Sequence, residues 1–204
     1  MVSLDEMIKG AWIEGGSLLD DRFGKMALGP KFIEQLAALL VELHKSSYET
    51  RLPFAMWSVV ENLVSWADSF CEEALYDLYS IKSELTGSVS LHGDLWRQNI
   101  LVDQEGNLNG LRDWESLSVG DPHWDFRMIR RWIGWDGLDE LLWKYNSKVE
   151  WVCNRTYIEI LDKISICNSI KIRQERGLLR HDKPDAIETF EKLKEDFKLP
   201  HLEV

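Results

Sequence analysis

The chain has 204 residues, a length typical of one domain, and 45% of them are hydrophobic, which is enough to build a core. A formal net charge of −11 argues against a nucleic-acid-binding face; it suits a neutral or cationic small-molecule partner, and it suits plain solubility equally well. Three cysteines without metal-ligand spacing, no leader-like pattern over residues 1–10 and no apolar run of bilayer length predict a cytoplasmic protein without a membrane partner.

The first half of the chain is predicted to be mainly helical. Residues 7–13 indicate a short strand that ends at the pair Gly15-Gly16. Residues 31–47 predict the first long helix, because isoleucine and leucine recur there at helical spacing and a proline stands just before it. Residues 55–85 predict either one long helix or two helices with a bend near Asp68.

A β-hairpin is predicted in the middle of the chain. Residues 88–91 indicate a short extended piece, and residues 100–103 an apolar strand. Residues 104–107 have the composition of a turn, and residues 108–113 read as the return strand. The hairpin therefore interrupts two helical halves.

Helical patterns return from residue 121. A break is expected near residues 134–137, followed by a short helix over 138–145, a long helix over 149–173 and a last helix over 185–198. The predicted fold class is mainly α (α+β): one mostly helical domain with a small central β-hairpin.

Ten tryptophans are many for this length, and seven of them fall between Trp96 and Trp151. Clustered indoles can stack on a sugar or another ring ligand, but most of these are expected to fill a helical core. They do not single out a ligand.

The stretch with the clearest chemical content reads HGDLWRQN over residues 92–99. Phosphoryl transfer to an alcohol needs a group that orients the hydroxyl and accepts its proton, together with metal ligands that neutralise the phosphates. Asp94, in a loop, can do the first, and the carbonyl of Asn99, at the start of a strand, can do part of the second. Asp113 can supply a carboxylate to the same metal, because the hairpin returns it to the end at which Asn99 lies.

These residues resemble the catalytic loop of protein kinases and, more closely, that of the aminoglycoside phosphotransferases and choline kinases. The string H-G-D-x-x-x-x-N over residues 92–99 is followed by a hairpin that ends in Asp113-Trp114-Glu115 and then by GDPHWD over residues 120–125. Three motif blocks in the family's order and spacing make the resemblance specific. It implies a protein-kinase-like C-terminal lobe.

The resemblance implies a role for each matched residue. Asp94 would be the catalytic base and His92 would brace its loop, while Asn99 and Asp113 would hold Mg²⁺ and with it the nucleotide. Asp125, at the start of a helix, would anchor the loop. The implied cofactors are Mg²⁺ and ATP or another nucleoside triphosphate. The implied partner is a small hydroxylated acceptor of the aminoglycoside or choline kind, in which a cationic group would suit the acidic chain.

Several of these residues also have a purely structural interpretation. His92 taken alone is more often a satisfied core histidine than a functional one. Asp121 can be only a helix cap before Pro122, and Glu115 can be a surface carboxylate. Arg112 departs from the family, which usually has an aliphatic residue there, and it is harmless if it points outward on the strand.

The resemblance extends upstream. It divides the chain into residues 1–18, similar to the last strand of the family's N-terminal lobe and its hinge, and residues 19–204, similar to the C-terminal lobe. Hinge backbone atoms hold the adenine in the family, which implies Trp12, Ile13 and Glu14 as nucleotide-binding residues. The rest of the N-terminal lobe has no counterpart in the sequence. Phosphotransferase activity of this chain alone is therefore expected to be weak or absent, and the uncovered top of the lobe is expected to attract a partner or a second copy.

Two other functions fit the sequence less well. A non-catalytic binding or regulatory module is favoured by the missing lobe and opposed by the intact Asp94, Asn99 and Asp113. A metal-dependent hydrolase usually needs more imidazole ligands than this chain offers. Its candidate ligands would be His92, Asp94, Asp113, Asp121 and His123.

Overall fold

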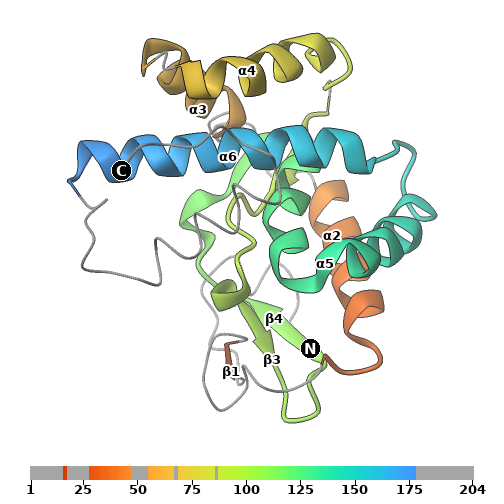
Figure 1. Cartoon of the computed structure of the whole chain (residues 1–204). Coiled ribbons are helices and arrows are strands. Elements are labelled where there is room, and N and C mark those ends of the chain that lie inside the picture. Colours follow the sequence, from red (N-terminus) through yellow and green to blue (C-terminus); the bar gives the residue numbers. More distant parts are fainter. Residues whose placement is uncertain (1–15, 18–27, 47–54, 67–68, 86, 178–204) are drawn as a thin grey trace.

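Helices make up most of the part of the chain that the computed structural model describes, which is residues 16–17, 28–46, 55–66, 69–85 and 87–177 (Figure 1). The predicted fold class is confirmed, since a small antiparallel sheet lies at one end of a mostly helical domain. In chain order the elements are β1 (Gly16–Ser17), α2 (Phe32–Lys45), α3 (Ala55–Trp66), α4 (Ser69–Ile81), β2 (Val89–Leu91), η1 (Arg97–Asn99), β3 (Ile100–Val102), β4 (Leu108–Leu111), η2 (Trp114–Ser116), β5 (Ser118–Gly120), α5 (His123–Asn146) and α6 (Arg155–Glu175).

The strands form two separate antiparallel sheets, one of three strands and one of two. β3 and β4 are the predicted hairpin, with Ile100 opposite Leu111, and β1 pairs with the other side of β3. β2 and β5 pair with Leu91 opposite Ser118. One loop leads from β2 toward β3 and a second leads from β4 to β5. Because the strands at both ends of these loops are partners, the two loops lie side by side.

The helices pack in two groups that meet at α6. The first hydrophobic core lies between α2, the hairpin and α5, and the second between α3, α4, β2 and α6. Figure 1 shows α6 running across the molecule with α3 and α4 on one side and α5 on the other. Since α6 is covered on two sides, apolar residues occupy more of its surface than a single stripe.

Several helix predictions are confirmed. The helix expected over residues 31–47 is α2, and residues 55–85 form two helices, α3 and α4, rather than one. The break expected near residues 134–137 is at Gly134, whose φ of 72° and ψ of −178° are conformations reserved for glycine.

One predicted boundary is wrong. α6 begins at Arg155 and not at residue 149, because Asn154 ends the preceding loop and its side-chain oxygen accepts a hydrogen bond from the Tyr157 N–H group at 3.0 Å, as a helix cap does. Gly16, expected to lie just after a strand, itself pairs with Val102 in β1. The strand expected over residues 7–13 and the helix over 185–198 lie outside the described residues.

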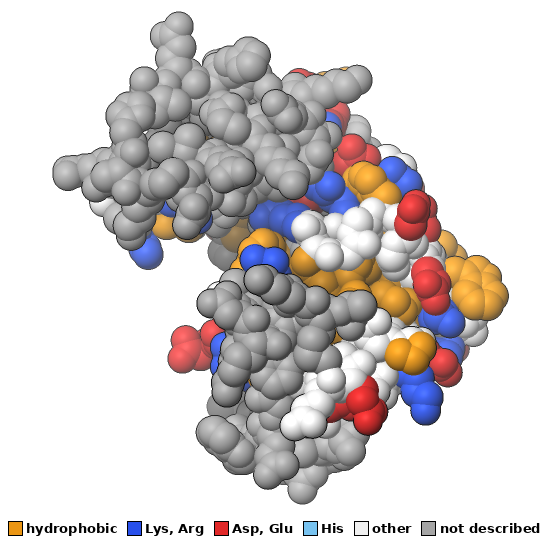
Figure 2. All heavy atoms as spheres, turned by 60° about the horizontal axis from the view of Figure 1, so that its bottom comes forward, with side chains coloured by type: hydrophobic (Ala, Val, Ile, Leu, Met, Phe, Trp, Pro, Cys, Tyr) orange, Lys and Arg blue, Asp and Glu red, His pale blue; other side chains and the backbone are white. Residues whose placement is uncertain are grey.

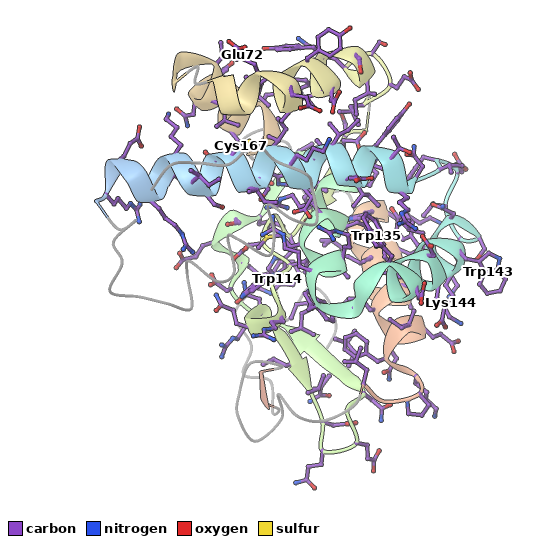
Figure 3. The ribbon with its side chains drawn as sticks, viewed as in Figure 1. Glu72, Trp114, Trp135, Trp143, Lys144 and Cys167 are labelled. Carbon is purple, nitrogen blue, oxygen red and sulfur yellow. The ribbon has the colours of Figure 1, made fainter. Side chains whose placement is uncertain are left out.

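Most of the described tryptophans serve the core, as expected. Trp124 is buried, and Trp114, Trp132, Trp135 and Trp151 pack against the first core. Trp143 does not, since it is 73% exposed and points outward at the edge of the domain (Figure 3). None of the helices in the described ranges is long and apolar enough to cross a membrane.

Candidate active site

The loop over residues 92–99 lies against the loop that follows β4. The backbone N–H group of Arg112 donates to the Asn99 carbonyl at 2.9 Å. Gly93 has a φ of 82°, and a Cβ atom at this position would collide with the backbone oxygen of Ser116. The two loops can therefore approach this closely because residue 93 is glycine.

His92 connects the two loops from inside. Its ring is buried, and Nε2 donates to the Arg112 carbonyl at 3.0 Å while Nδ1 accepts from the Asp94 N–H group at 3.3 Å. Burial holds the pKa of His92 below its usual value, against the opposing influence of nearby carboxylates led by Asp125. The neutral ring carries its proton on Nε2, and Trp114 packs on it with ring centroids 4.5 Å apart. Both ring nitrogens are thus used within the protein.

Asp94 and Asn99 form a side-chain pair. The amide nitrogen of Asn99 donates to Oδ2 of Asp94 at 3.0 Å and to the Asp94 carbonyl at 2.9 Å. Asn99 is buried and Asp94 half-buried, so a fixed amide orients a carboxylate that solvent can still reach. The hydrogen bonds leave the amide oxygen of Asn99 and the second carboxylate oxygen of Asp94 for other partners.

Asp113 follows β4 in a left-handed conformation, with a φ of 63° and a ψ of 69°. This conformation is uncommon for residues other than glycine, although aspartate tolerates it better than most. The side chain is exposed. Because Arg112 is bonded to Asn99, the next residue, Asp113, begins its turn beside the end of the 92–99 loop.

Asp125 holds the start of the same loop from α5, as expected for an anchor. Its carboxylate is fully buried and accepts from the N–H groups of His92 at 2.9 Å and Gly93 at 2.8 Å. Burial alone would raise the pKa of Asp125, but the interactions with His44, His92 and the Gly93 N–H group together outweigh it, and the pKa lies below its usual value.

Three residues that support this anchor were not predicted from the sequence. His44 contacts Asp125 through Nε2 at 3.3 Å and Tyr145 through Nδ1 at 2.6 Å. The side chain of Arg127 donates to the Gly93 carbonyl at 2.8 Å, and burial lowers its pKa only to about 10, so it stays charged at neutral pH. No motif spacing identifies His44 or Tyr145. For Arg127, the one indication in the sequence is that a charged residue stands on the buried face of a predicted helix.

Asp121 and His123 belong to a different environment. Oδ1 of Asp121 accepts from the His123 N–H group at 3.0 Å, which confirms the helix-cap interpretation, and it also contacts the His123 ring at 2.5 Å. The other ring nitrogen of His123 accepts from the Asn154 N–H group at 3.0 Å. Within the described residues no group of three or more His, Cys, Asp or Glu side chains could hold a metal ion. The hydrolase interpretation therefore gains no support.

The donor set near Asp94 does suit magnesium. Mg²⁺ prefers oxygen ligands, and in phosphate-transfer sites it is bound through one or two carboxylates together with substrate phosphates and water. The amide oxygen of Asn99 and the exposed carboxylate of Asp113 are ligands of this kind.

Other predicted features are not tested by these residues. Trp12, Ile13 and Glu14 lie outside the described part of the chain, as does most of the predicted 1–18 unit. Figure 2 shows hydrophobic side chains of the described residues in the middle of the face at the sheet end. The expectation that a partner or second copy covers this face stays a prediction.

Glu115 and Arg112 are exposed, in agreement with the surface interpretations given for them.

Comparison with known proteins gives a consistent result. A family model described as "Phosphotransferase enzyme family" matches residues 10–151. The uncharacterized protein YcbJ of Bacillus subtilis (strain 168) is 39% identical over 57 residues, which cover 28% of this chain and 19% of that protein.

Solved structures show where the fold has been seen before. A macrolide 2'-phosphotransferase type I has a TM-score of 0.64 at 20% identity, covering 94% of this chain and 68% of its own. The choline kinase LicA from Streptococcus pneumoniae has a TM-score of 0.63 at 17% identity, covering 92% and 69%. The GDP and kanamycin complex of APH(2")-IIia has a TM-score of 0.68 at 15% identity, also covering 92% and 69%. At such identities the likeness shows the fold, which is protein-kinase-like.

Proposed function

Because the chain belongs to the phosphotransferase enzyme family, we propose that it transfers the γ-phosphoryl group of ATP, or of another nucleoside triphosphate, to a hydroxyl group of a small acceptor. The observation that carries this proposal is the pairing of Asp94 with Asn99 at 3.0 Å, beside the loop that presents Asp113. A half-buried carboxylate with one oxygen fixed and one reachable is suited to accept a proton.

In the proposed reaction the acceptor oxygen attacks the γ-phosphorus, and the bond from that phosphorus to its bridging oxygen breaks. Asp94 orients the acceptor hydroxyl and takes its proton as the new bond forms. Asn99 keeps Asp94 in one rotamer through Oδ2. His92 acts as a positioning residue, because both of its nitrogens bond to the two loops and neither faces an acceptor.

Asn99, through its amide oxygen, and Asp113, through its carboxylate, would hold Mg²⁺. Held by these two side chains, the ion would neutralise charge on the phosphate oxygens. The left-handed turn at Asp113 suits this role, since strained backbone conformations of this kind persist where function requires a side chain to be aimed.

The acceptor is proposed to be a hydroxylated molecule that carries a positive charge. The net charge of −11 favours the approach of a cation. One relative is a choline kinase and another was solved with kanamycin, and both of these ligands are cationic alcohols. Cytoplasmic location follows from the proposed use of ATP and stays part of the proposal.

A phosphate-transfer screen of amino sugars, choline and related alcohols tests the proposal, run with the wild-type protein and with Asp94→Asn. We expect transfer in the mutant to fall by about 10²–10⁴-fold, the usual contribution of a positioned acid–base group. Equal rates in the two proteins would refute the role of Asp94. The same screen measures whether the chain alone is weakly active, as the sequence predicts.

The alternative of a non-catalytic module makes the opposite prediction for nucleotide. Ligands that bind the folded state raise the unfolding temperature by mass action. An unchanged unfolding temperature in millimolar Mg-ATP, together with no transfer in the screen, would favour the module.

A further inference from the structure

Arg112 stands directly before Asp113, at a position where the family usually has an aliphatic residue. Its backbone is fixed on both sides. The N–H group donates to the Asn99 carbonyl at 2.9 Å, and its own carbonyl accepts from Nε2 of His92 at 3.0 Å. The Cα atom of Arg112 is therefore tied to the loop that carries the proposed base.

The side chain of Arg112 is tied to the same loop. Nε donates to the Gln98 carbonyl at 3.0 Å, while the residue as a whole is exposed. Within the described part of the chain, the Arg112 side chain makes this one hydrogen bond. The bond uses Nε and leaves the two terminal nitrogens of the guanidinium group unused. A guanidinium fixed through Nε presents its two terminal nitrogens as a planar fork, which matches two oxygens of one phosphate.

Other arginines of the domain are used differently. Arg130 and Arg131 bind the fully buried carboxylate of Asp162. Arg127 donates to the carbonyls of Trp124 and Gly93. Their guanidinium groups have structural partners, whereas Arg112 is exposed and is bonded through Nε within the described part of the chain.

We propose that Arg112 is a phosphate-binding residue of the nucleotide site, with its terminal nitrogens donating to the oxygens of one phosphate group. The inference rests on the proposed function, because it takes the phosphate chain to lie by Asn99 and Asp113. Asp94, Asp113 and Glu115 stand on the two loops that Arg112 joins, and their carboxylates repel an anion. A guanidinium fixed among them offsets that repulsion, which an aliphatic side chain cannot do.

Binding of inorganic tripolyphosphate, measured calorimetrically without divalent metal, tests Arg112 apart from catalysis. The variants are Arg112→Leu and Arg112→Lys, with Arg97→Leu as the matched control. Arg97 is an exposed cation on the neighbouring 92–99 loop, placed over the Trp96 ring, and its loss changes the net charge equally. We expect Arg112→Leu to weaken binding by about tenfold or more and Arg97→Leu by about twofold or less. Arg112→Lys should recover part of the loss, because it keeps the charge and not the fork.

A second measurement identifies the group that Arg112 contacts. Arg112→Leu should weaken ADP binding by the same factor as tripolyphosphate and leave adenosine binding within about twofold. Equal effects of Arg112→Leu and Arg97→Leu, or an equal loss of adenosine binding, would overturn the proposal, as would a wild type that binds no tripolyphosphate. If the wild type transfers phosphate and Arg112→Leu binds ADP as tightly as the wild type does, only the phosphate-binding role of Arg112 is refuted. If ADP binding depends on Arg112 but the wild type transfers no phosphate, only the proposed function is refuted.

Discussion

The carboxylate of Asp125 accepts a hydrogen bond from the backbone N–H group of Gly93 at 2.8 Å, across 32 positions of the chain. The same carboxylate binds the N–H group of His92, so α5 fixes the backbone immediately before Asp94. Arg127, two residues further along α5, binds the Gly93 carbonyl at 2.8 Å. One residue of the loop, Gly93, is thus held at both its N–H group and its carbonyl by buried charged side chains, which positions the proposed base without touching it.

Asp125→Asn should destabilise the protein strongly. In the fully buried site, the NH₂ group of the asparagine would face a backbone N–H group, and two donors cannot bond to each other. The charge-assisted hydrogen bonds from the His92 and Gly93 N–H groups would be lost. We expect the free energy of unfolding to fall by about 3 kcal/mol in urea denaturation. Asp94→Asn is the control, since Asp94 is half-buried, and it should lose about 1 kcal/mol or less. Similar losses in the two variants would contradict the anchoring role.

Gly93→Ala should lower both stability and phosphate transfer. Gly134→Ala is the control that measures how much of the stability loss comes from the positive φ alone. Both glycines have positive φ, 82° and 72°, but a Cβ at Gly93 meets Ser116 while a Cβ at Gly134 meets nothing within 4 Å. Gly134→Ala should cost about 1–3 kcal/mol through strain alone. Gly93→Ala should cost more in urea denaturation and should lower phosphate transfer at least tenfold, because the two loops must separate and carry Asp94 with them. Transfer that falls equally in both variants would show that the collision with Ser116 is not important.

The local elements of this site could be predicted from the sequence because their signals are local. The spacing from His92 to Asn99 and the hairpin to Asp113 predicted which side chains share one end of the sheet. The helix cap at Asp121 was likewise visible in the pair Asp-Pro. Each of these depends on residues of one short continuous segment, where propensity and spacing act directly.

The supporting residues could not be predicted for the same reason. His44 lies 81 positions from Asp125 and 101 from Tyr145, and no sequence period connects them. The start of α6 was misplaced because apolar residues before Asn154 continue the helical pattern into a loop that packs on the core. Tertiary packing determines both the contacts of His44 and the start of α6, and the spacing of residues in the sequence does not show that packing.

The neutral state of buried His92 predicts a pH dependence of stability. Its folded pKa lies below the ordinary value of 6.5, so below that pH the unfolded chain binds more protons at this residue than the folded one. The contribution of His92 to the free energy of unfolding should therefore be constant above pH 6.5. It should fall as the pH drops from 6.5 toward the pKa of His92 in the folded protein. The contribution of His92 to this slope is at most about 1.4 kcal/mol per pH unit.

His92→Gln isolates this contribution, because the amide can still donate toward the Arg112 carbonyl and does not titrate. Urea denaturation as a function of pH should show a shallower slope just below 6.5 in the variant than in the wild type. Parallel curves would mean that His92 titrates alike in the folded and unfolded chains.

Asp113→Asn tests the metal site by the Mg²⁺ requirement of nucleotide binding. Asparagine tolerates the left-handed conformation of Asp113 as aspartate does, so the backbone turn should survive while the negative charge is lost. We expect the Mg²⁺ concentration at half-maximal ADP binding to rise by about tenfold or more, since the ion loses one charged ligand. Glu115→Gln is matched in charge and exposure two residues further on, and it should shift the midpoint by about twofold or less. Tryptophan fluorescence reports the titration. A common shift in both variants would reduce the effect to general electrostatics and would remove Asp113 from the proposed ligands.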